Sequence, residues 1–197
     1  MNSKLTIWHI LLLFLVFSFT SCKLKTDYQR WEESELASGV VQDSIFLGIS
    51  FGMNKKAFYA HCWELNKEGL VRQGPKNMTV QYDMPDLKFP AKLNFYPTFD
   101  ENGIIEMPAT VAYDAWAPWN RERQSDSLQI DVKNALEQDY GIAFMEIEHP
   151  TKGKAFVHVS GNRRINIVRK DAQHVSLTYT DLRKKEAIQK LQATEKG

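Results

Sequence analysis

Two spacings of apolar residues alternate along this chain, one typical of helices and one of strands. After Asn54, the residues Phe58, Cys62 and Leu65 recur at intervals of four and three. That spacing predicts a helix with one buried face, on which Cys62 is a small core residue rather than a reactive thiol. Asn54 is a suitable N-cap, and Gly69 is a suitable stop because the residue past a helix end often needs positive φ.

A second helix is predicted to begin after Ser125 or Asp126 and to end before Gly141. Ser125 or Asp126 is placed to cap it, and with Asp126 as the cap, Gln129 falls at the last position of a capping box. Gly141 follows as a stop signal. The buried face is marked by Leu128, Val132, Ala135, Leu136 and Tyr140.

Strand signals surround these helices. The compact apolar run at residues 44–51 (SIFLGISF) predicts a buried strand, and alternation at residues 80–84 predicts another. Residues 92–98 and 104–113 are expected to form a hairpin through an Asn-Gly turn. The prolines within that hairpin, Pro97 and Pro108, remove ladder donors and predict an edge or a bulge.

The C-terminal third predicts a meander. Four strand-length segments (residues 144–149, 155–160, 163–169 and 175–179) are separated by short turns, and short turns join antiparallel neighbours. Asp181 then begins a charged helix with Leu182, Ile188 and Leu191 inward.

The predicted fold is therefore α+β. We expect a mainly antiparallel sheet of about 7–8 strands, with two helices packed on it and a short C-terminal helix. Each half of the chain has a helix followed by strands, which suggests an internal duplication without evident sequence identity.

The first twenty-two residues have the layout of a secretory signal. Lys4 precedes a mostly apolar run, and Phe19-Thr20-Ser21-Cys22 closes it. The run is short for a bilayer span, which needs about 20 apolar residues, and it contains His9. The alternatives are a signal anchor that stays uncleaved and a secreted protein in which Cys22 is incidental.

The four residues ending at Cys22 resemble the lipobox of bacterial lipoprotein precursors, with Phe19 in the looser form commonest in Bacteroidota. The resemblance implies cleavage before Cys22, a diacylglycerol on its sulfur and an acyl chain, such as palmitate, on its new amine. Two or three chains anchor stably. Lys23, where an aspartate is linked to inner-membrane retention, favours the outer membrane, with its periplasmic or surface face left open.

The lipobox divides the chain into a signal peptide at residues 1–21, an acylated cysteine with a polar tether at 22–43, and one domain at 44–197. Within the domain, the Gly48-Ile-Ser-Phe-Gly-Met-Asn54 strand-to-helix transition and the element order resemble two kinds of small envelope domain. These are the outer-membrane assembly lipoproteins of the SmpA/OmlA type and the β-lactamase-inhibitor-like domains. The resemblance implies no functional residue.

Charge and cysteine content exclude several classes of function. The chain has 25 Lys and Arg against 24 Asp and Glu, and loss of Lys4 with the signal leaves a formally neutral protein. Neutrality argues against a nucleic-acid partner, which needs a cationic face. If Cys22 is acylated, Cys62 has no partner for a disulfide, and no cysteine-histidine cluster offers a zinc site. We expect no metal and no cofactor.

Known catalytic motifs are absent from the sequence, but two polar clusters need weighing. Glu146 and Glu148 share a predicted strand face, with His158 on the hairpin partner, which makes this hairpin the place for a shallow hydrolase site. Arg163 and Arg169 share a strand face and form a candidate anion patch. For both clusters, a solvated sheet face is the alternative.

Trp116, Pro118 and Trp119 form the candidate partner-binding group. Large aromatic residues on a loop can anchor a protein or stack on a sugar ring. The alternative is that the tryptophans fold over the second helix as a lid on the core.

Taken together, these patterns predict an envelope lipoprotein that binds or assists another envelope protein or glycan without catalysis. The alternatives are a hydrolase or sugar-processing accessory enzyme at the Glu146/His158 hairpin, and a structural spacer.

Overall fold

The computed structural model describes residues 26–75, 78–149, 151, 153–185 and 188–189. The predicted signal peptide, Cys22 and Leu191, which is predicted to face inward, lie outside these residues. Residues 32–197 form one compact unit, and residues 1–31 are assigned to another.

The centre of the fold is one antiparallel sheet of nine strands, in place of the 7–8 expected. The additional strands are β1 and β4, which are too short to produce a visible alternation. The strands are β1 (Val71–Gln73), β2 (Val80–Met84), β3 (Ala91–Phe95), β4 (Thr98–Asp100), β5 (Gly103–Tyr113), β6 (Met145–His149), β7 (Gly153–Ser160), β8 (Arg163–Arg169) and β9 (His174–Asp181).

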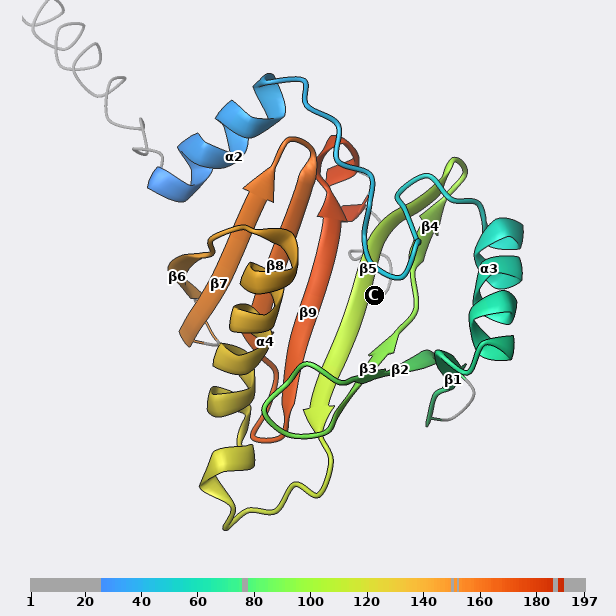
Figure 1. Cartoon of the computed structure of the whole chain (residues 1–197). Coiled ribbons are helices and arrows are strands. Elements are labelled where there is room, and N and C mark those ends of the chain that lie inside the picture. Colours follow the sequence, from blue (N-terminus) through green and yellow to red (C-terminus); the bar gives the residue numbers. More distant parts are fainter. Residues whose placement is uncertain (1–25, 76–77, 150, 152, 186–187, 190–197) are drawn as a thin grey trace, which may run out of the picture. The chain divides into compact units, whose positions relative to one another are not determined.

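The strand order is β1-β2-β3-β5-β9-β8-β7-β6, with β4 paired to β5 (Figure 1). The first meander therefore occupies one half of the sheet and the second meander the other, in reversed order. They meet where β5 pairs antiparallel with β9 from Glu106↔Thr180 to Ala112↔His174. The repeated element order predicted for the two halves is thus present as two mirrored meanders about one strand pair.

Within the described residues, three α-helices accompany the sheet: α2 (Asp27–Ala37), α3 (Lys55–Lys67) and α4 (Ser125–Tyr140). Short 3-10 turns form η2 (Arg121–Arg123) and η3 (Leu182–Lys184), so the predicted C-terminal helix begins as a 3-10 turn in which Asp181 accepts from the N–H of Arg183. No described helix is both long enough and apolar enough to cross a membrane.

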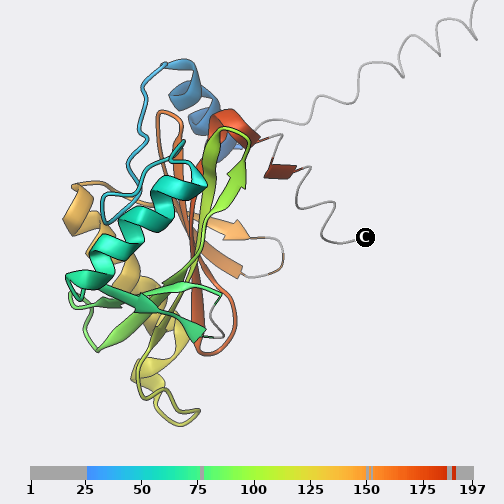
Figure 2. The same cartoon turned by 90° about the vertical axis from the view of Figure 1, so that its right-hand side faces the viewer.

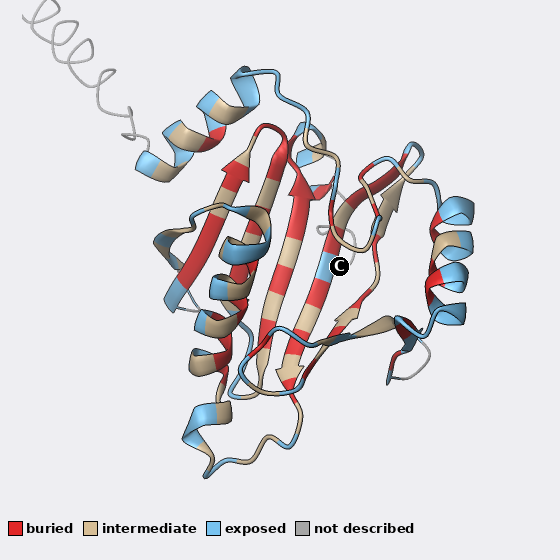
Figure 3. Cartoon of the chain, viewed as in Figure 1, coloured by how far each residue is buried: buried red, intermediate tan, exposed pale blue. Residues whose placement is uncertain are grey.

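The core lies between one face of the sheet and helices α3 and α4, which cover that face (Figure 2). Buried positions alternate along β5, β8 and β9 (Figure 3), as expected for strands with one face covered. Helix α3 contributes Phe58 and Cys62, and the N-cap role of Asn54 is confirmed by a hydrogen bond from the N–H of Ala57 (2.9 Å). Gly141 ends α4 with φ 63°, also as predicted.

The strand predicted at residues 44–51 is wrong. This segment folds back on itself as a loop closed by a single bridge between Ser44 and Ser50. Leu47 and Gly48 have positive φ values of 51° and 74°, which an extended strand cannot accommodate. Ile45 and Ile49 are nevertheless buried, so the apolar run indicated burial correctly but not conformation.

The loop also explains a glycine at the start of β5. The N–H of Gly52 donates to the carbonyl of Ile104 (2.8 Å), and the N–H of Ile104 donates to the carbonyl of Met53 (3.0 Å). A Cβ on Gly103 would lie 2.3 Å from the carbonyl oxygen of Gly52, so no larger residue fits there.

The capping box predicted for α4 is also wrong. The helix begins at Ser125, and Gln129 is buried with an exposed fraction of 2%. Its amide donates to the carbonyls of Lys154 (3.1 Å) and Ile167 (3.0 Å). A polar side chain near the start of a helix can form hydrogen bonds either with the backbone of its own helix or with a neighbouring strand. Gln129 bonds to the strands, and so it holds α4 against β7 and β8.

Pro108 lies in β5, which is central rather than an edge, and the predicted bulge explains it. The Pro108 carbonyl accepts from the N–H of Tyr96 (3.4 Å), and the N–H and C=O of one strand residue point to the same side. The missing donor of Pro108 therefore faces the break between β3 and β4, where the register shifts at Thr98/Phe99.

Part of the predicted tether belongs to the domain. Glu32 is 8% exposed and forms ion pairs with Arg164 (3.1 Å) and Lys185. The N–H of Gly161 donates to the Glu35 carboxylate (2.9 Å), and Asn162 accepts from the N–H of Gln42 (2.7 Å). Residues 32–43 are thus held to the β7–β8 turn. Because Glu32 lies within α2 (Asp27–Ala37), the stretch available as a flexible tether ends before Asp27.

Glu32→Gln should lower the free energy of unfolding by about 3 kcal/mol, because it leaves the largely buried Arg164 guanidinium without its carboxylate partner. Urea denaturation of the purified chain measures the change. Glu101→Gln, which changes an exposed glutamate in the β4–β5 turn, is the control and should stay within about 0.5 kcal/mol of wild type. Equal stability of the two variants would contradict the placement of residues 32–43 in the folded unit.

Candidate functional site

The tryptophan loop, which we define as residues 114–124, connects β5 to α4 and projects beyond the end of the sheet (Figure 1). One side chain organises it. The Gln124 amide donates to the carbonyls of Ala117 (3.0 Å), Pro118 (3.2 Å) and Asn120 (3.2 Å), and its oxygen accepts from the Trp116 indole (3.4 Å). The loop conformation is therefore set before any partner binds.

A second set of contacts ties the base of the loop to the connection between β2 and β3. The Arg123 guanidinium donates to the carbonyl of Asp114 (2.7 Å) and lies 4.4 Å from the centre of the Phe89 ring. Ala115 has a positive φ of 54°, which turns the chain out of β5. These contacts hold the loop at both of its ends.

The two predicted anchor tryptophans have different environments. Trp119 has an exposed fraction of 84%, Pro118 is exposed, and Trp116 is half-buried beside Gln124. Neither tryptophan belongs to the buried core cluster. The alternative of a lid over the core therefore fails for Trp119.

A polar hollow of about 570 Å³ adjoins the loop. It brings hydrogen-bonding side chains of both charges next to Pro118, the neighbour of Trp119 in the loop. Its lining is Pro118, Arg121, Glu122, Gln124, Asp126 and Ser127.

The candidate anion patch does not form. Arg163 is 7% exposed, donates to the carbonyl of Ser44 (3.0 Å) and lies over the Tyr140 ring at 5.3 Å. Arg169 is exposed at the other end of β8, about 20 Å away at the rise of a strand. Alternation predicted a shared face correctly, but the buried Arg163 serves to hold the start of the 44–51 loop.

The Glu146/His158 hairpin also lacks a shared site. Glu146 pairs with Lys154 (2.8 Å), and His158 Nδ1 is 2.9 Å from the carbonyl oxygen of Ala143. Glu148 lies opposite Lys154, which puts it about 13 Å along the sheet from His158. Distance separates these groups, although the register places them on one face.

The part of the chain that the structure describes contains no set of residues arranged as metal ligands. No group of three or more His, Cys, Asp or Glu side chains is arranged there to hold an ion.

Comparison with known proteins gives no identity for the chain. No protein-family model matches it, and neither the curated proteins nor the solved structures contain a match. No family is shown. The assignment of function therefore depends on the molecule itself.

Sequence reasoning missed an aromatic groove of about 380 Å³ between α3 and β1. Tyr59, Trp63 and Met78 there have exposed fractions of 50%, 61% and 71%, and the hydroxyls of Tyr59 and Tyr96 are 2.6 Å apart. A signal existed, because Tyr59 and Trp63 directly follow the buried positions 58 and 62 and so fall off the core-facing stripe.

A second missed feature is an apolar pocket of about 340 Å³ between the 44–51 loop and α4. No pattern pointed to it, since its lining comes from five segments that are distant in sequence. The residues are Ser44, Ile45, Phe46, Leu47, Gly48, Tyr82, Met84, Leu93, Leu136, Asp139, Tyr140, Leu177 and Tyr179.

Cys62 is a core residue, as predicted, with an exposed fraction of 9%. Burial raises the pKa of its thiol to about 11, because the thiolate would lose its hydration. The thiol also borders the aromatic groove, so chemical reagents can approach it while few molecules carry the reactive thiolate.

Alkylation of Cys62 by iodoacetamide at pH 8 should be slower by on the order of 100-fold than in the urea-unfolded chain, where the thiol pKa returns to about 8.5. Peptide mass spectrometry measures the rate at Cys62 separately from Cys22. A folded-state rate close to the unfolded one would mean that the thiol is neither buried nor shifted.

Proposed function

We propose that this chain is an envelope lipoprotein, anchored by acylated Cys22, that binds another envelope component through the tryptophan loop without catalysis. The partner is a glycan or a protein. The observation that carries the proposal is Trp119, which is 84% exposed on a loop whose conformation Gln124 sets in advance. Exposing a large indole to water is unfavourable for a free protein, and a partner that covers it recovers that free energy.

The character of the adjoining hollow favours a glycan. An indole face stacks on the C–H face of a sugar ring, and sugar hydroxyls need donors and acceptors close by. Arg121, Glu122 and Asp126 line the hollow next to the loop and supply both. In a protein interface, the residues next to a central anchor usually form an apolar core, and polar residues lie farther out at the rim.

The short distance in sequence between Cys22 and the domain supports the proposed lipid anchor. Helix α2 begins at Asp27, so only residues 23–26 separate Cys22 from the first described helix, and an extended stretch of that length spans at most about 14 Å. A lipid at Cys22 would thus keep the domain close to the membrane surface.

The anchor is tested by Cys22→Ser. We expect this change to abolish incorporation of labelled palmitate and to move the protein from the membrane fraction to the soluble fraction, because the sulfur that carries the diacylglycerol is gone. Cys62→Ser is the matched control and should keep both the label and the membrane association. Labelling that persists in Cys22→Ser would rule out this anchor.

The loop is tested by Trp119→Ala in intact cells. We expect crosslinked products to fall at least about 30-fold, equivalent to about 2 kcal/mol of binding free energy, because a central tryptophan anchor is removed. Quantitative blots of crosslinked membranes provide the measurement, and sensitivity of the products to glycosidase or protease identifies the partner class.

Trp63→Ala is the control, since Trp63 is also an exposed tryptophan, on α3. It should leave the products unchanged. Loss of products in Trp63→Ala with retention in Trp119→Ala would transfer the function to the aromatic groove and overturn the loop assignment.

A further inference from the structure

We propose that the apolar pocket between the 44–51 loop and α4 binds a small ligand with an apolar body and a cationic amine head. This site is separate from the tryptophan loop, so it stands or fails independently of the function proposed above.

The pocket is pre-formed because its roof is held at both ends. The Tyr140 hydroxyl donates to the carbonyl of Ile45 (2.7 Å), and His61 Nε2 is 2.6 Å from the carbonyl oxygen of Leu47. Between these points, the Phe46 ring packs edge-on against Phe95 (4.9 Å between ring centres) and Tyr179 (5.5 Å). A roof fixed in this way does not have to be ordered when a ligand binds.

The floor and one wall are apolar and come from rigid elements. Leu93 and Leu177 provide the sheet floor, and Leu136 provides the α4 wall, each less than 10% exposed. A volume of about 340 Å³ is within the usual range for small-molecule sites and holds an aromatic ring or a short alkyl group. The lining therefore selects an uncharged, apolar ligand body.

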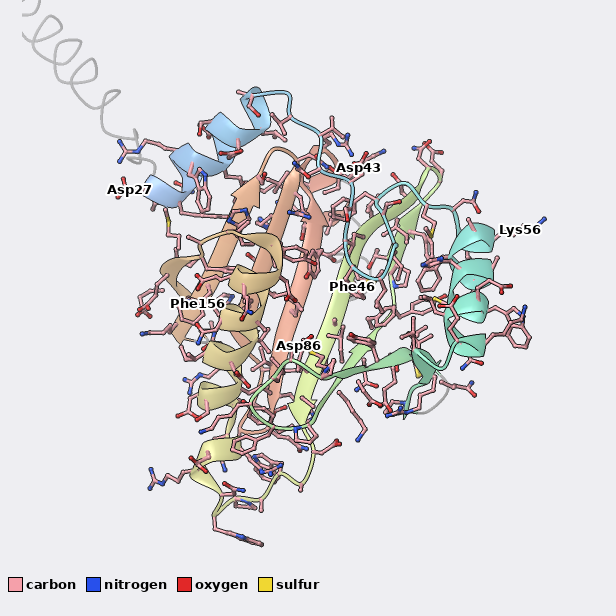
Figure 4. The ribbon with its side chains drawn as sticks, in the orientation of Figure 1. Asp27, Asp43, Phe46, Lys56, Asp86 and Phe156 are labelled. Atoms are coloured by element: carbon pink, nitrogen blue, oxygen red, sulfur yellow. The ribbon has the colours of Figure 1, made fainter. Side chains whose placement is uncertain are left out.

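The mouth of the pocket is acidic. Asp139 is exposed and lines the pocket near Tyr82, and Asp86 follows β2, on which Tyr82 and Met84 lie. Figure 4 labels Asp86 and Phe46 on the α4 side of the sheet. No ion pair joins Asp86 or Asp139 to another residue in the described part of the chain, whereas Asp83 is paired with Arg72.

The pKa of Tyr82 is shifted by the same negative charges. Burial raises its pKa, and the negative charges of Asp86, Asp139 and Asp83 raise it further. The guanidinium of Arg163 lies over the Tyr140 ring on the Ser44 side of the pocket, so the preference for a cation over an anion applies to the part of the mouth formed by Asp139 and Tyr82. Amine heads fit this requirement, and carboxylate heads oppose it.

A matched ligand series separates the two parts of the proposal. Phenethylamine, phenethyl alcohol and phenylacetate share a ring and a chain length but carry a cationic, a neutral and an anionic head. Equilibrium dialysis at pH 7 against the full chain in phosphatidylcholine nanodiscs, with empty nanodiscs as the blank, should rank binding as amine, then alcohol, then carboxylate.

Two variants test the assigned groups. Asp139→Asn should weaken phenethylamine binding about 5-fold and leave phenethyl alcohol unchanged, because only the charge at the mouth is removed. Glu148→Gln, which neutralises an exposed carboxylate on β6, is the matched control and should change neither. Met84→Trp should abolish binding of all three compounds by filling the pocket, with a thermal unfolding scan to confirm that the variant is folded.

Binding no stronger than to empty nanodiscs would overturn the site. Equal binding of amine and carboxylate, or an Asp139→Asn variant that behaves like Glu148→Gln, would overturn the charge assignment. Asp139→Asn is a surface change at the last turn of α4, where loss of a negative charge is favourable for the helix dipole, so its result is readable even if Met84→Trp does not fold.

Discussion

The pairing of β5 with β9 is the interaction on which the rest of this structure depends. It joins two meanders that otherwise have no strand in common, and seven residue pairs align across it. Its buried side carries Val111 and Leu177 against the helices. Because the pair is central, both strands are held on two sides, and β5 provides a firm base for the tryptophan loop that follows it.

The second constraint is the space between α3 and α4, which lie over different halves of the sheet. A sheet this wide exposes apolar surface between two helices, and the 44–51 loop covers it with Ile45 and Ile49. A folded-back loop fills such a space less evenly than a helix does. The apolar pocket beside α4 is a consequence of this mode of covering.

Much of the fold followed from local patterns. Asn54 and Gly141 behave as their types predict, because capping and positive φ depend on a few neighbouring atoms. The prediction was wrong where the local sequence was compatible with more than one structure. Residues 44–51 are apolar enough for a strand, and Gln129 fits a capping box, but the contacts that decide their roles come from residues distant in sequence. The tryptophan loop was predicted as a candidate, whereas its exposure and its organisation by Gln124 were not.

By itself, the sequence determined the fold class, the cap of α3, the stop of α4, the antiparallel meanders and the burial of Cys62, because periodicity and turn chemistry act over short distances. Only the tertiary structure decided that Trp119 faces solvent, that Arg163 is buried and that an acidic-mouthed pocket exists. Those properties depend on which distant segments meet. Side-chain burial and cavity shape result from packing in three dimensions, and no short-range pattern encodes them.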